Sequence, residues 1–217
     1  EVTARNKAAV QAAKEMGKDV VIATGRPYLG ISKLLNELKL NTDVDYVVAF
    51  NGALVKNVGT GEIVYCGPVT HADYHGLYAL SLELGVHIHA LTETYVTTPV
   101  HNPYTKIESD INGIETVLCD VHAFPETETI IKVMFVDGKE KLDAVEKSLS
   151  DAIKSKYTVV RSAPIFLEFL NPNVDKGVGV AEVAKIKGLK PENVISVGDA
   201  GNDLAMIRYA GLGVAMG

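Results

Sequence analysis

The sequence predicts an α/β fold with a parallel sheet, plus an inserted α+β domain with an antiparallel sheet. At both ends of the 217-residue chain, short apolar segments alternate with amphipathic helices, a pattern typical of parallel sheets. In the middle, strand-like segments follow one another without that alternation, as in antiparallel sheets. We therefore expect a first domain that is split, at residues 1–68 and 170–217, around an inserted domain at residues 69–169.

The first part of the chain contains clear strand and helix signals. Residues 19–23 and 46–50 are short, apolar and rich in β-branched side chains, as expected of strands buried on both faces. Apolar side chains recur at helical spacing in residues 6–16 and again after Pro27. The expected order is a helix at 6–16 with Thr3 as N-cap and Gly17 at its end, a strand at 19–23, a helix that begins near Pro27, a strand at 46–50, and a hairpin of strands 54–57 and 63–66 that turns at Gly59-Thr60-Gly61.

From about His71 the pattern changes to clustered strands. We expect a helix at 71–84 ended by Gly85, strands at 86–91 and 95–98, a polar stretch, a strand at 130–136, a long charged helix at 139–153, and strands at 157–161 and 165–170. The helices of this domain are expected to cover one face of its sheet. Alternation then resumes with a helix at 176–187, a strand at 194–198, a helix at 202–210 and a strand at 212–216.

The composition is that of an ordinary globular protein and excludes several classes. Hydrophobic residues make up 47% and charged residues 22%, which argues against disorder. The net charge of −6 argues against a protein that coats nucleic acid, and the apolar runs are far shorter than the roughly 20 residues of a membrane helix. Cys66 and Cys119 are too few for a disulfide framework, so we expect free thiols and a cytoplasmic location.

Two short motifs could bind a phosphate group. Thr24-Gly25-Arg26 follows the strand at 19–23, and there a hydroxyl, an unobstructed backbone amide and a helix N-terminus could converge on an anion. Alone, this motif is more typical of a simple turn. Asp175-Lys176-Gly177 begins the helix at 176–187, where a lysine is unfavourable unless a bound anion compensates its charge. A solvated surface lysine is the alternative.

The strongest chemical signal is the segment VGDAGND at residues 197–203. Asp199 lies at the strand tip and Asp203 one helical turn further on, and such oxygen ligands suit Mg²⁺, which takes one or two protein carboxylates and keeps several waters. A helix cap alone would need one polar residue, whereas this segment has three together with two glycines. The segment therefore favours metal or phosphate chemistry at the carboxyl end of a strand, where open α/β sheets bind ligands.

Other candidate motifs are weaker indications of function. His87 and His89 share one strand face but have no third zinc ligand nearby in the sequence. They could instead point from the inserted domain toward a substrate. The sequence contains no P-loop, no GxGxxG fingerprint after Gly198 and no GxSxG nucleophile elbow.

Taken in order, the segments ATGR, NGA, DKG, VGDAGNDLAMI and AGLGVAMG resemble the motifs of the haloacid dehalogenase superfamily, and more narrowly those of the Cof-type sugar-phosphate phosphatases. The resemblance covers essentially the whole chain. It implies a Rossmann-like core with a mobile α+β cap inserted after the third core strand. It also implies a Mg²⁺-dependent phosphatase that acts on small phosphorylated metabolites through an aspartyl-phosphate.

The resemblance also assigns roles to individual residues. Lys176 would neutralise the phosphate and the nucleophile, Asp199 would ligate Mg²⁺, and Asp203 would orient the site. The expected catalytic residues are thus Thr24, Lys176 and Asp199; the expected phosphate- or substrate-binding residues are Thr24, Gly25, Arg26, Asn51, Lys176 and Asn202; and the expected metal-binding residues are Asp199 and Asp203.

One motif of the superfamily is absent from this sequence. The Asp-x-Asp-Gly-Thr segment, which holds the nucleophile and the general acid, has no counterpart before Thr24. In the family this segment follows the central strand, between the strands expected here at 19–23 and 194–198. Loss of that strand would cost ~1–3 kcal/mol for each buried unpaired group, which should unfold the core.

We therefore expect the natural protein to carry a further N-terminal segment, and the chain as given to be clipped at both ends and inactive. An intact mass of 23.3 kDa for a folded protein would count against this expectation.

Two other functions remain open from the sequence. One is a non-catalytic module that binds phosphate and metal, and the other is a phosphomutase-type phosphotransferase that returns the phosphoryl group to a sugar. The expected partner is a small phosphorylated metabolite rather than nucleic acid or a membrane. Its identity would be set by side chains of the cap, and the oligomeric state is left open.

Overall fold

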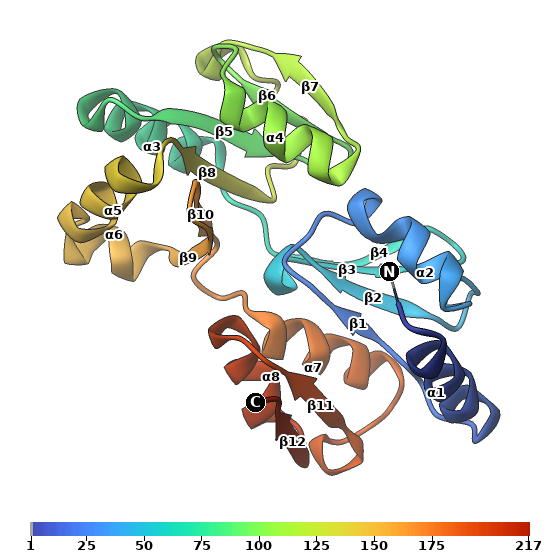
Figure 1. Ribbon diagram of the computed structural model, residues 1–217. Coiled ribbons are helices and arrows are strands. Elements are labelled where there is room, and N and C mark those ends of the chain that lie inside the picture. The colour runs from blue at the N-terminus through green and yellow to red at the C-terminus, as the bar shows by residue number, and fades with distance from the viewer. Residues whose placement is uncertain (1) are drawn as a thin grey trace. The chain divides into compact units, whose positions relative to one another are not determined.

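The chain folds as two compact units (Figure 1). The computed structural model describes residues 2–217. Unit 1 comprises Glu1–Cys66 and Asp175–Gly217, and unit 2 comprises Gly67–Val174. Unit 1 is therefore assembled from both ends of the chain, and its limits lie close to the boundaries expected after residues 68 and 169. Within the described part of the chain, no helix is both long and apolar enough to cross a membrane.

Unit 1 alternates helices and strands. In order, its elements are α1 (Ala4–Glu15), β1 (Ile22–Ala23), the 3₁₀ turn η1 (Leu29–Ile31), α2 (Ser32–Glu37), β2 (Tyr46–Ala49), η2 (Phe50–Gly52), β3 (Leu54–Asn57), β4 (Ile63–Cys66), α7 (Lys176–Ile186), η4 (Pro191–Asn193), β11 (Ile195–Gly198), η5 (Gly201–Asp203), α8 (Leu204–Tyr209) and β12 (Leu212–Ala215). Thr3 caps α1 as predicted, because its hydroxyl accepts a hydrogen bond from the amide of Asn6 at 3.2 Å. The hairpin of β3 and β4 has the predicted bounds.

Helices pack on both faces of the main sheet of unit 1, which has the strand order β1-β2-β3-β4. On one face, Val47 packs in a cluster with Ile31, Leu35 and Leu38 from the α2 region. On the other face, the neighbouring Val48 packs with Val183 of α7. Because successive strand residues point to opposite faces, β2 is buried on both sides, as its continuous apolar sequence predicted. Among the described strands of unit 1, the pairs β1–β2 and β11–β12 are parallel, whereas β2, β3 and β4 run antiparallel.

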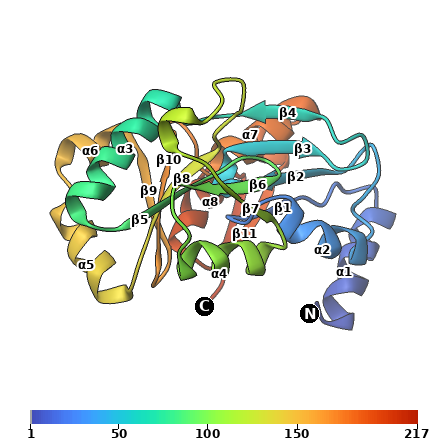
Figure 2. The same ribbon diagram turned by 90° about the horizontal axis from the view of Figure 1, so that it is seen from above.

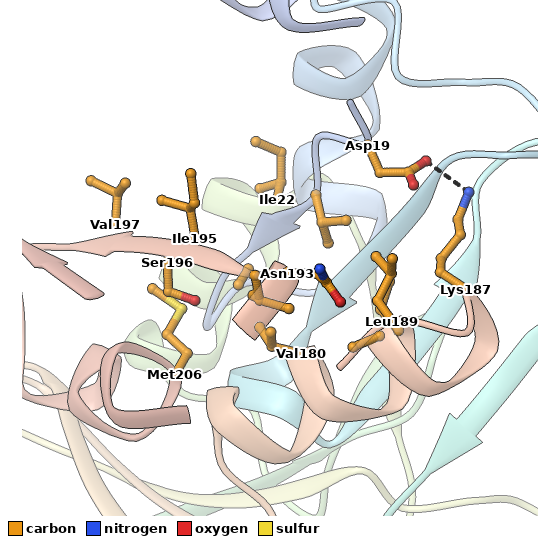
Figure 3. A pocket seen from close by; sticks show the side chains of 15 residues that line it. Asp19, Ile22, Val180, Lys187, Leu189, Asn193, Ile195, Ser196, Val197 and Met206 are labelled. Carbon is orange, nitrogen blue, oxygen red and sulfur yellow. Dashed lines mark hydrogen bonds and ion pairs between the residues drawn. The ribbon is translucent and has the colours of Figure 1, made fainter. Parts of the chain in front are cut away.

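A pocket of about 320 Å³ separates β1 from β11 (Figure 3). Among the described strands, β1 pairs with β2 and β11 pairs with β12, so each has one sheet edge toward this pocket. Ile195 and Val197 of β11 are 67% and 53% exposed, although their sequence is that of a buried strand. The predicted strand at 19–23 was too long, since only Ile22–Ala23 is extended in register. A strand with a ladder on one side has half of the hydrogen bonds that fix a central strand.

Unit 2 is built on a six-stranded sheet of order β7-β6-β5-β8-β10-β9. Its elements are α3 (His71–Leu84), β5 (His87–Leu91), β6 (Tyr95–Thr98), α4 (Pro103–Asn112), β7 (Glu115–Leu118), η3 (Val121–Ala123), β8 (Lys132–Val136), α5 (Lys139–Ser148), α6 (Asp151–Lys156), β9 (Thr158–Ala163) and β10 (Phe166–Leu170). The sheet is antiparallel except for the parallel pair of β6 and β7. The long helix predicted at 139–153 is two helices, because the hydroxyl of Ser150 caps a new helix at the amide of Ile153.

The prediction that helices cover one face of this sheet was wrong. Helices α3, α5 and α6 gather on one side of strands β5, β8 and β9, and α4 lies apart from them (Figures 1 and 2). The first face is apolar and contains Ile88, Val133 and Phe135 packed with Leu77 and Leu142 of the helices. The residues between them on the strands point to the opposite face, which α4 covers.

Helix α4 lies in the polar stretch for which no element was predicted. Its inward face is polar, with Thr105, Glu108 and Asn112 buried, whereas Ile107 and Ile111 are 38% and 53% exposed. The polarity is therefore reversed relative to an ordinary amphipathic helix. The buried partners of α4 are polar as well, since the hydroxyl of Thr105 lies 2.9 Å from Nδ1 of His89. A search for an inward apolar stripe cannot detect such a helix.

Asp73 at the start of α3 is expected to make unit 2 sensitive to acid. Burial alone would raise the pKa of its carboxyl, but hydrogen bonds from Lys156, Thr70 and Tyr157 lower that pKa to about 2. A lowered pKa in the folded state stabilises the fold above the ordinary value of 3.8, and this contribution is lost as the pH falls toward 2.

We therefore expect Asp73→Asn to cost on the order of 1–2 kcal/mol at pH 7 and nothing near pH 2. Urea unfolding across this pH range measures the difference, and Asp110→Asn, at an exposed pair with Lys106 on α4, is the matched control. An Asp73→Asn penalty that does not change with pH would contradict the assignment.

Candidate functional site

The residues predicted to form the site lie on loops of unit 1 that follow its strands or begin α7. Thr24 and Gly25 follow β1, Asn51 lies in η2 directly after β2, and Asp199 follows β11. Lys176 is the first residue of α7. Because these positions follow strand ends or begin a helix, several of them can present backbone amides and polar side chains to one ligand.

Lys176 and Asp203 form a buried ion pair. The Nζ of Lys176 donates a hydrogen bond to Oδ1 of Asp203, and the residues are 7% and 4% exposed. Burial alone would raise the pKa of the Asp203 carboxyl, but hydrogen bonds from Lys176 and from the amides of Asp199 and Ala200 lower it below its ordinary value. The Asp203 carboxyl is therefore ionised at neutral pH, and its contact with Lys176 joins the start of α7 to the acidic loop of residues 199–203.

Asp203 also fixes the loop that carries Asp199. Its Oδ2 accepts hydrogen bonds from the amides of Asp199 at 3.0 Å and of Ala200 at 3.1 Å. Gly198 allows this arrangement, because a Cβ at that position would lie 2.3 Å from Cβ of Asp203. The carboxylate of Asp203 is thus occupied in holding the loop.

A second set of contacts joins the Thr24 turn to the acidic loop. The amide of Thr24 donates to the carbonyl of Val48 at 2.8 Å, and the carbonyl of Thr24 accepts from the amide of Asn51 at 2.9 Å. The side chain of Asn51 then accepts a hydrogen bond from Nδ2 of Asn202 at 2.9 Å. A continuous path of contacts therefore runs from Thr24 to the loop of residues 199–203.

The structure places the predicted residues in two linked groups. One group contains Thr24, Gly25, Asn51 and Asn202, and the other contains Lys176, Asp199 and Asp203. They join through the adjacent residues Asn202 and Asp203. Arg26 is exposed, and its backbone rather than its side chain takes part, since its amide donates to the Thr24 hydroxyl and its carbonyl accepts from Phe50. His87 and His89 lie in unit 2, where His89 is fully buried.

The family model for haloacid dehalogenase-like hydrolases matches residues 1–217. The chain belongs to this family. This membership confirms the superfamily predicted from the order of the motifs.

Relatives of this haloacid dehalogenase-like hydrolase include proteins named as phosphatases. "Putative phosphatase YxeH" of Bacillus subtilis is 40% identical over 218 residues, which cover 100% of this chain and 81% of the relative. "Putative phosphatase M6_Spy0533" of Streptococcus pyogenes is 39% identical over 213 residues, which cover 96% of this chain and 78% of the relative. Together with the family, these relatives support a hydrolase of the phosphatase type.

A solved structure supports the fold class. A haloacid dehalogenase-like hydrolase from Bacteroides thetaiotaomicron is 30% identical and superposes with a TM-score of 0.85, over 100% of this chain and 82% of that one. The likeness confirms the predicted mixed α/β fold.

The donor groups of the acidic loop fit a Mg²⁺ ion that takes one protein carboxylate. Asp199 is exposed, and no hydrogen bond or ion pair from residues 2–217 engages its carboxylate. Within the same residues, no three His, Cys, Asp or Glu side chains gather in a way that could hold a metal. Asp199 would therefore be the ligand from this chain, with water and phosphate oxygens in the other positions, as Mg²⁺ commonly takes them. Asp203, already held by Lys176 and two amides, would support that ligand from behind.

Sequence reasoning missed the backbone conformation that brings the two groups together. Phe50 and Asn51 have φ of 51° and 56°, in the left-handed region that residues with a Cβ rarely adopt. The Asn51-Gly52 dipeptide signalled a break after the strand, but it did not signal the direction in which the chain turns. The turn follows from contacts with residues far along the sequence.

Proposed function

We propose that the protein is a Mg²⁺-dependent phosphatase that hydrolyses small phosphorylated metabolites, such as sugar phosphates, through an aspartyl-phosphate intermediate. The observation that carries this proposal is a path of contacts across the site. Hydrogen bonds join Thr24 to Asn51 and Asn51 to Asn202, and the next residue, Asp203, pairs with Lys176. It gathers a hydroxyl, an ammonium group and carboxylates on neighbouring loops, which is the equipment of phosphoryl transfer.

Each group would act on the phosphate in a distinct way. The hydroxyl of Thr24 and the amide of Gly25 would donate hydrogen bonds to phosphoryl oxygens, and the ammonium of Lys176 would offset their charge. The carboxylate of Asp199 would hold a Mg²⁺ ion. When bound, this ion would supply Lewis-acid stabilisation of the transferring group. Asp203 would hold Lys176 and the Asp199 loop in place through the hydrogen bonds that it already accepts.

The reaction would proceed in two displacements. A carboxylate oxygen would displace the ester oxygen from phosphorus, and the alcohol would leave with a proton from a general acid. Water would then displace the carboxylate and release inorganic phosphate. The Asp-x-Asp-Gly-Thr motif expected to supply this carboxylate and this acid is absent from the 217-residue sequence.

The pocket between β1 and β11 could hold the segment that carries the nucleophilic carboxylate. Thr24 directly follows β1 and Asp199 directly follows β11, so the two strands that border the pocket both lead into the site. A strand in this pocket could hydrogen-bond both edges and would carry its last residue between Thr24 and Asp199. We propose that the nucleophile is held there, and that residues 1–217 alone bind phosphate without turnover.

A non-catalytic binding module is the second candidate. The composition of the candidate site favours it, because the residues assigned to the site could bind phosphate and metal but none of them is assigned as a nucleophile. Binding of a sugar phosphate without release of phosphate, by the protein as its gene encodes it, would support this candidate over the phosphatase.

The state of the two cysteines supports a cytoplasmic location. Cys66 and Cys119 form no disulfide in the described part of the chain, and both are only partly buried. Free thiols persist in reducing compartments. We propose that the phosphatase acts in the cytoplasm.

The phosphatase proposal predicts that activity depends on Asp199 and on a divalent metal. Phosphate release from a panel of sugar phosphates should fall about 10–100-fold or more in Asp199→Asn, because loss of even an outer partner of a metal ligand has an effect of that size. EDTA should abolish release, and added Mg²⁺ should restore it. Glu192→Gln, at an exposed position of η4, is the matched control.

The intact mass of the same preparation shows which species is active. Turnover by a 23.3 kDa species would contradict the proposal that residues 1–217 alone bind phosphate without turnover. Activity that survives both Asp199→Asn and EDTA would reject the phosphatase mechanism as a whole.

A further inference from the structure

We propose that Asn51 is a positioning residue: a left-handed segment, Phe50–Gly52, holds its side-chain amide as the bridge that sets the Thr24 turn against the acidic loop. This inference rests on the proposed phosphatase function. It differs from the expectation that Asn51 faces the substrate, and it assigns Asn51 an action through Asn202 and Gly25.

The backbone of this segment is conformationally costly. Phe50, Asn51 and Gly52 have φ of 51°, 56° and 95°, so three consecutive residues lie in the left-handed region. Among residues 2–217, Lys39 is the remaining non-glycine residue with such a φ. Left-handed backbone at residues with a Cβ persists only where the surrounding contacts fix it, and it is concentrated at functional sites. Asparagine tolerates this region better than most residues.

Backbone contacts on both sides fix the segment. The amide of Phe50 donates to the carbonyl of Arg26 at 3.1 Å, and the amide of Asn51 donates to that of Thr24 at 2.9 Å. On the other side the chain abuts the start of α7, where a Cβ on Gly52 would lie 1.9 Å from the carbonyl oxygen of Asp175. The segment is therefore held between the Thr24 turn and the helix that begins with Lys176.

The side chain of Asn51 completes the bridge. Its Oδ1 accepts the hydrogen bond from Nδ2 of Asn202 at 2.9 Å. It also lies against the α-carbon of Gly25, because a Cβ added to Gly25 would be 2.9 Å from the same oxygen. One amide group thus contacts both of the loops that are expected to bind phosphate.

Burial indicates that Asn51 acts through its neighbours. The residue is 4% exposed, and its oxygen is already committed to Asn202. Thr24, Gly25 and Asn202 are each more exposed than Asn51. The separation between Thr24 and Asn202, and hence the shape of the phosphate site, is set by the Asn51 amide.

Asn51→Gly isolates this role, because glycine adopts the left-handed backbone without strain but lacks the amide. We expect kcat for the sugar phosphate used in the Asp199 test to fall about tenfold or more, with little change in KM, in Asn51→Gly. Asn202→Ala should lower kcat at least as much, because it removes the same hydrogen bond and an expected phosphate contact. The double variant should be no worse than Asn202→Ala alone, since both substitutions remove the same hydrogen bond. Lys39→Gly, which relaxes a left-handed residue with φ of 55° outside the site, should leave kcat unchanged.

Hydrogen exchange tests the bridge without turnover. In the unliganded protein, Asn51→Gly and Asn202→Ala should each accelerate exchange at the amide of Thr24 and at that of residue 51, whereas Lys39→Gly should not. A rise in KM alone, or losses that multiply in the double variant, would assign Asn51 to substrate contact and overturn the inference.

Unchanged exchange would overturn it as well, whatever the activity. If the protein as its gene encodes it shows no phosphatase activity, the proposed function fails, and the exchange measurement still decides whether Asn51 couples the two loops.

Discussion

Lys176→Met is expected to lower phosphatase activity by about 100–1,000-fold and to destabilise unit 1. The variant removes the ammonium that would face the transferring phosphoryl group, and loss of one preorganised electrostatic contact typically lowers kcat by ~10²–10³-fold. Methionine keeps most of the length of the side chain, so the change is mainly one of charge.

The same substitution should also weaken the fold around the site. Asp203 is 4% exposed, and without Lys176 its carboxylate would remain buried with two backbone amides as its hydrogen-bond donors. Breaking a buried pair on one side costs about 3–5 kcal/mol, because the other charge stays uncompensated. The lowered pKa of Asp203 means that the pair stabilises the folded state above the ordinary carboxyl pKa, and this contribution is lost as the pH falls through the lowered value.

A second lysine on the same helix provides the control. Lys185 has a 77% exposed side chain and pairs with Glu182 across one turn, so Lys185→Met should change stability by less than about 0.5 kcal/mol. Asp203→Asn combined with Lys176→Met should recover part of the stability and none of the activity. Urea unfolding and phosphate release measure the two effects. A Lys176→Met variant that hydrolyses sugar phosphates as fast as the unsubstituted protein would remove Lys176 from the proposed site.

Local sequence patterns predicted most elements of both units, because each of these patterns acts over a few residues. Helix α3 begins and ends at the predicted residues, since Thr70 caps its start and Gly85, with φ of 64°, ends it. Strands β3, β4 and β6 also have the predicted bounds. In each case the signal and the structure that it specifies lie within one segment.

Elements whose form depends on distant neighbours were mispredicted. Helix α4 was missed because its inward face is polar, and that face is favourable only where Lys132 and His89 of the sheet receive it. The strand at 19–23 was predicted too long, because the sequence shows its apolar character but not that the described strands pair with it along one edge. A short stretch of sequence predicts neither the polar partners of α4 nor the pairing of β1 along one edge.

The candidate site divides in the same way. The sequence predicted which loops carry polar residues, since Thr24 and Asp199 directly follow apolar strands. It did not predict which residues pair: Lys176 contacts Asp203 across 27 positions, and Asn202 contacts Asn51 across 151. Such pairs depend on how α7 and η2 pack against the strands. The order of motifs along the sequence does not predict this packing.

Lys132→Met is expected to destabilise unit 2 more than Asp73→Asn does. The Nζ of Lys132 lies 2.9 Å from Oε1 of Glu168 on β10 and 3.7 Å from Oε1 of Glu108 on α4, and the three side chains are 1%, 3% and 6% exposed. Burial alone would lower the pKa of Lys132, but the two carboxylates raise it, so the lysine is charged. Its removal would leave two buried carboxylates side by side.

The expected loss is about 3–5 kcal/mol, the usual effect of breaking a buried ion pair on one side. Burial and the charge of Lys132 lower the pKa of the nearby His89 to about 3, so Lys132 is the cation of this cluster in the wild-type protein. Urea unfolding, with hydrogen exchange at β5, β8 and β10 as the local readout, measures the loss.

Two comparison variants decide whether charge or packing is responsible. Lys106→Met on α4 removes an exposed lysine whose pair with Asp110 is 73% and 61% exposed, so it should change stability by less than about 0.5 kcal/mol. Adding Glu108→Gln and Glu168→Gln to Lys132→Met removes the two carboxylate charges that Lys132 contacts in the wild-type protein and should recover most of the loss, since neutral replacements of buried ion groups are often tolerated. If the triple variant is as unstable as Lys132→Met, the lysine stabilises unit 2 by packing alone, and charge does not hold the polar face of α4 against the sheet.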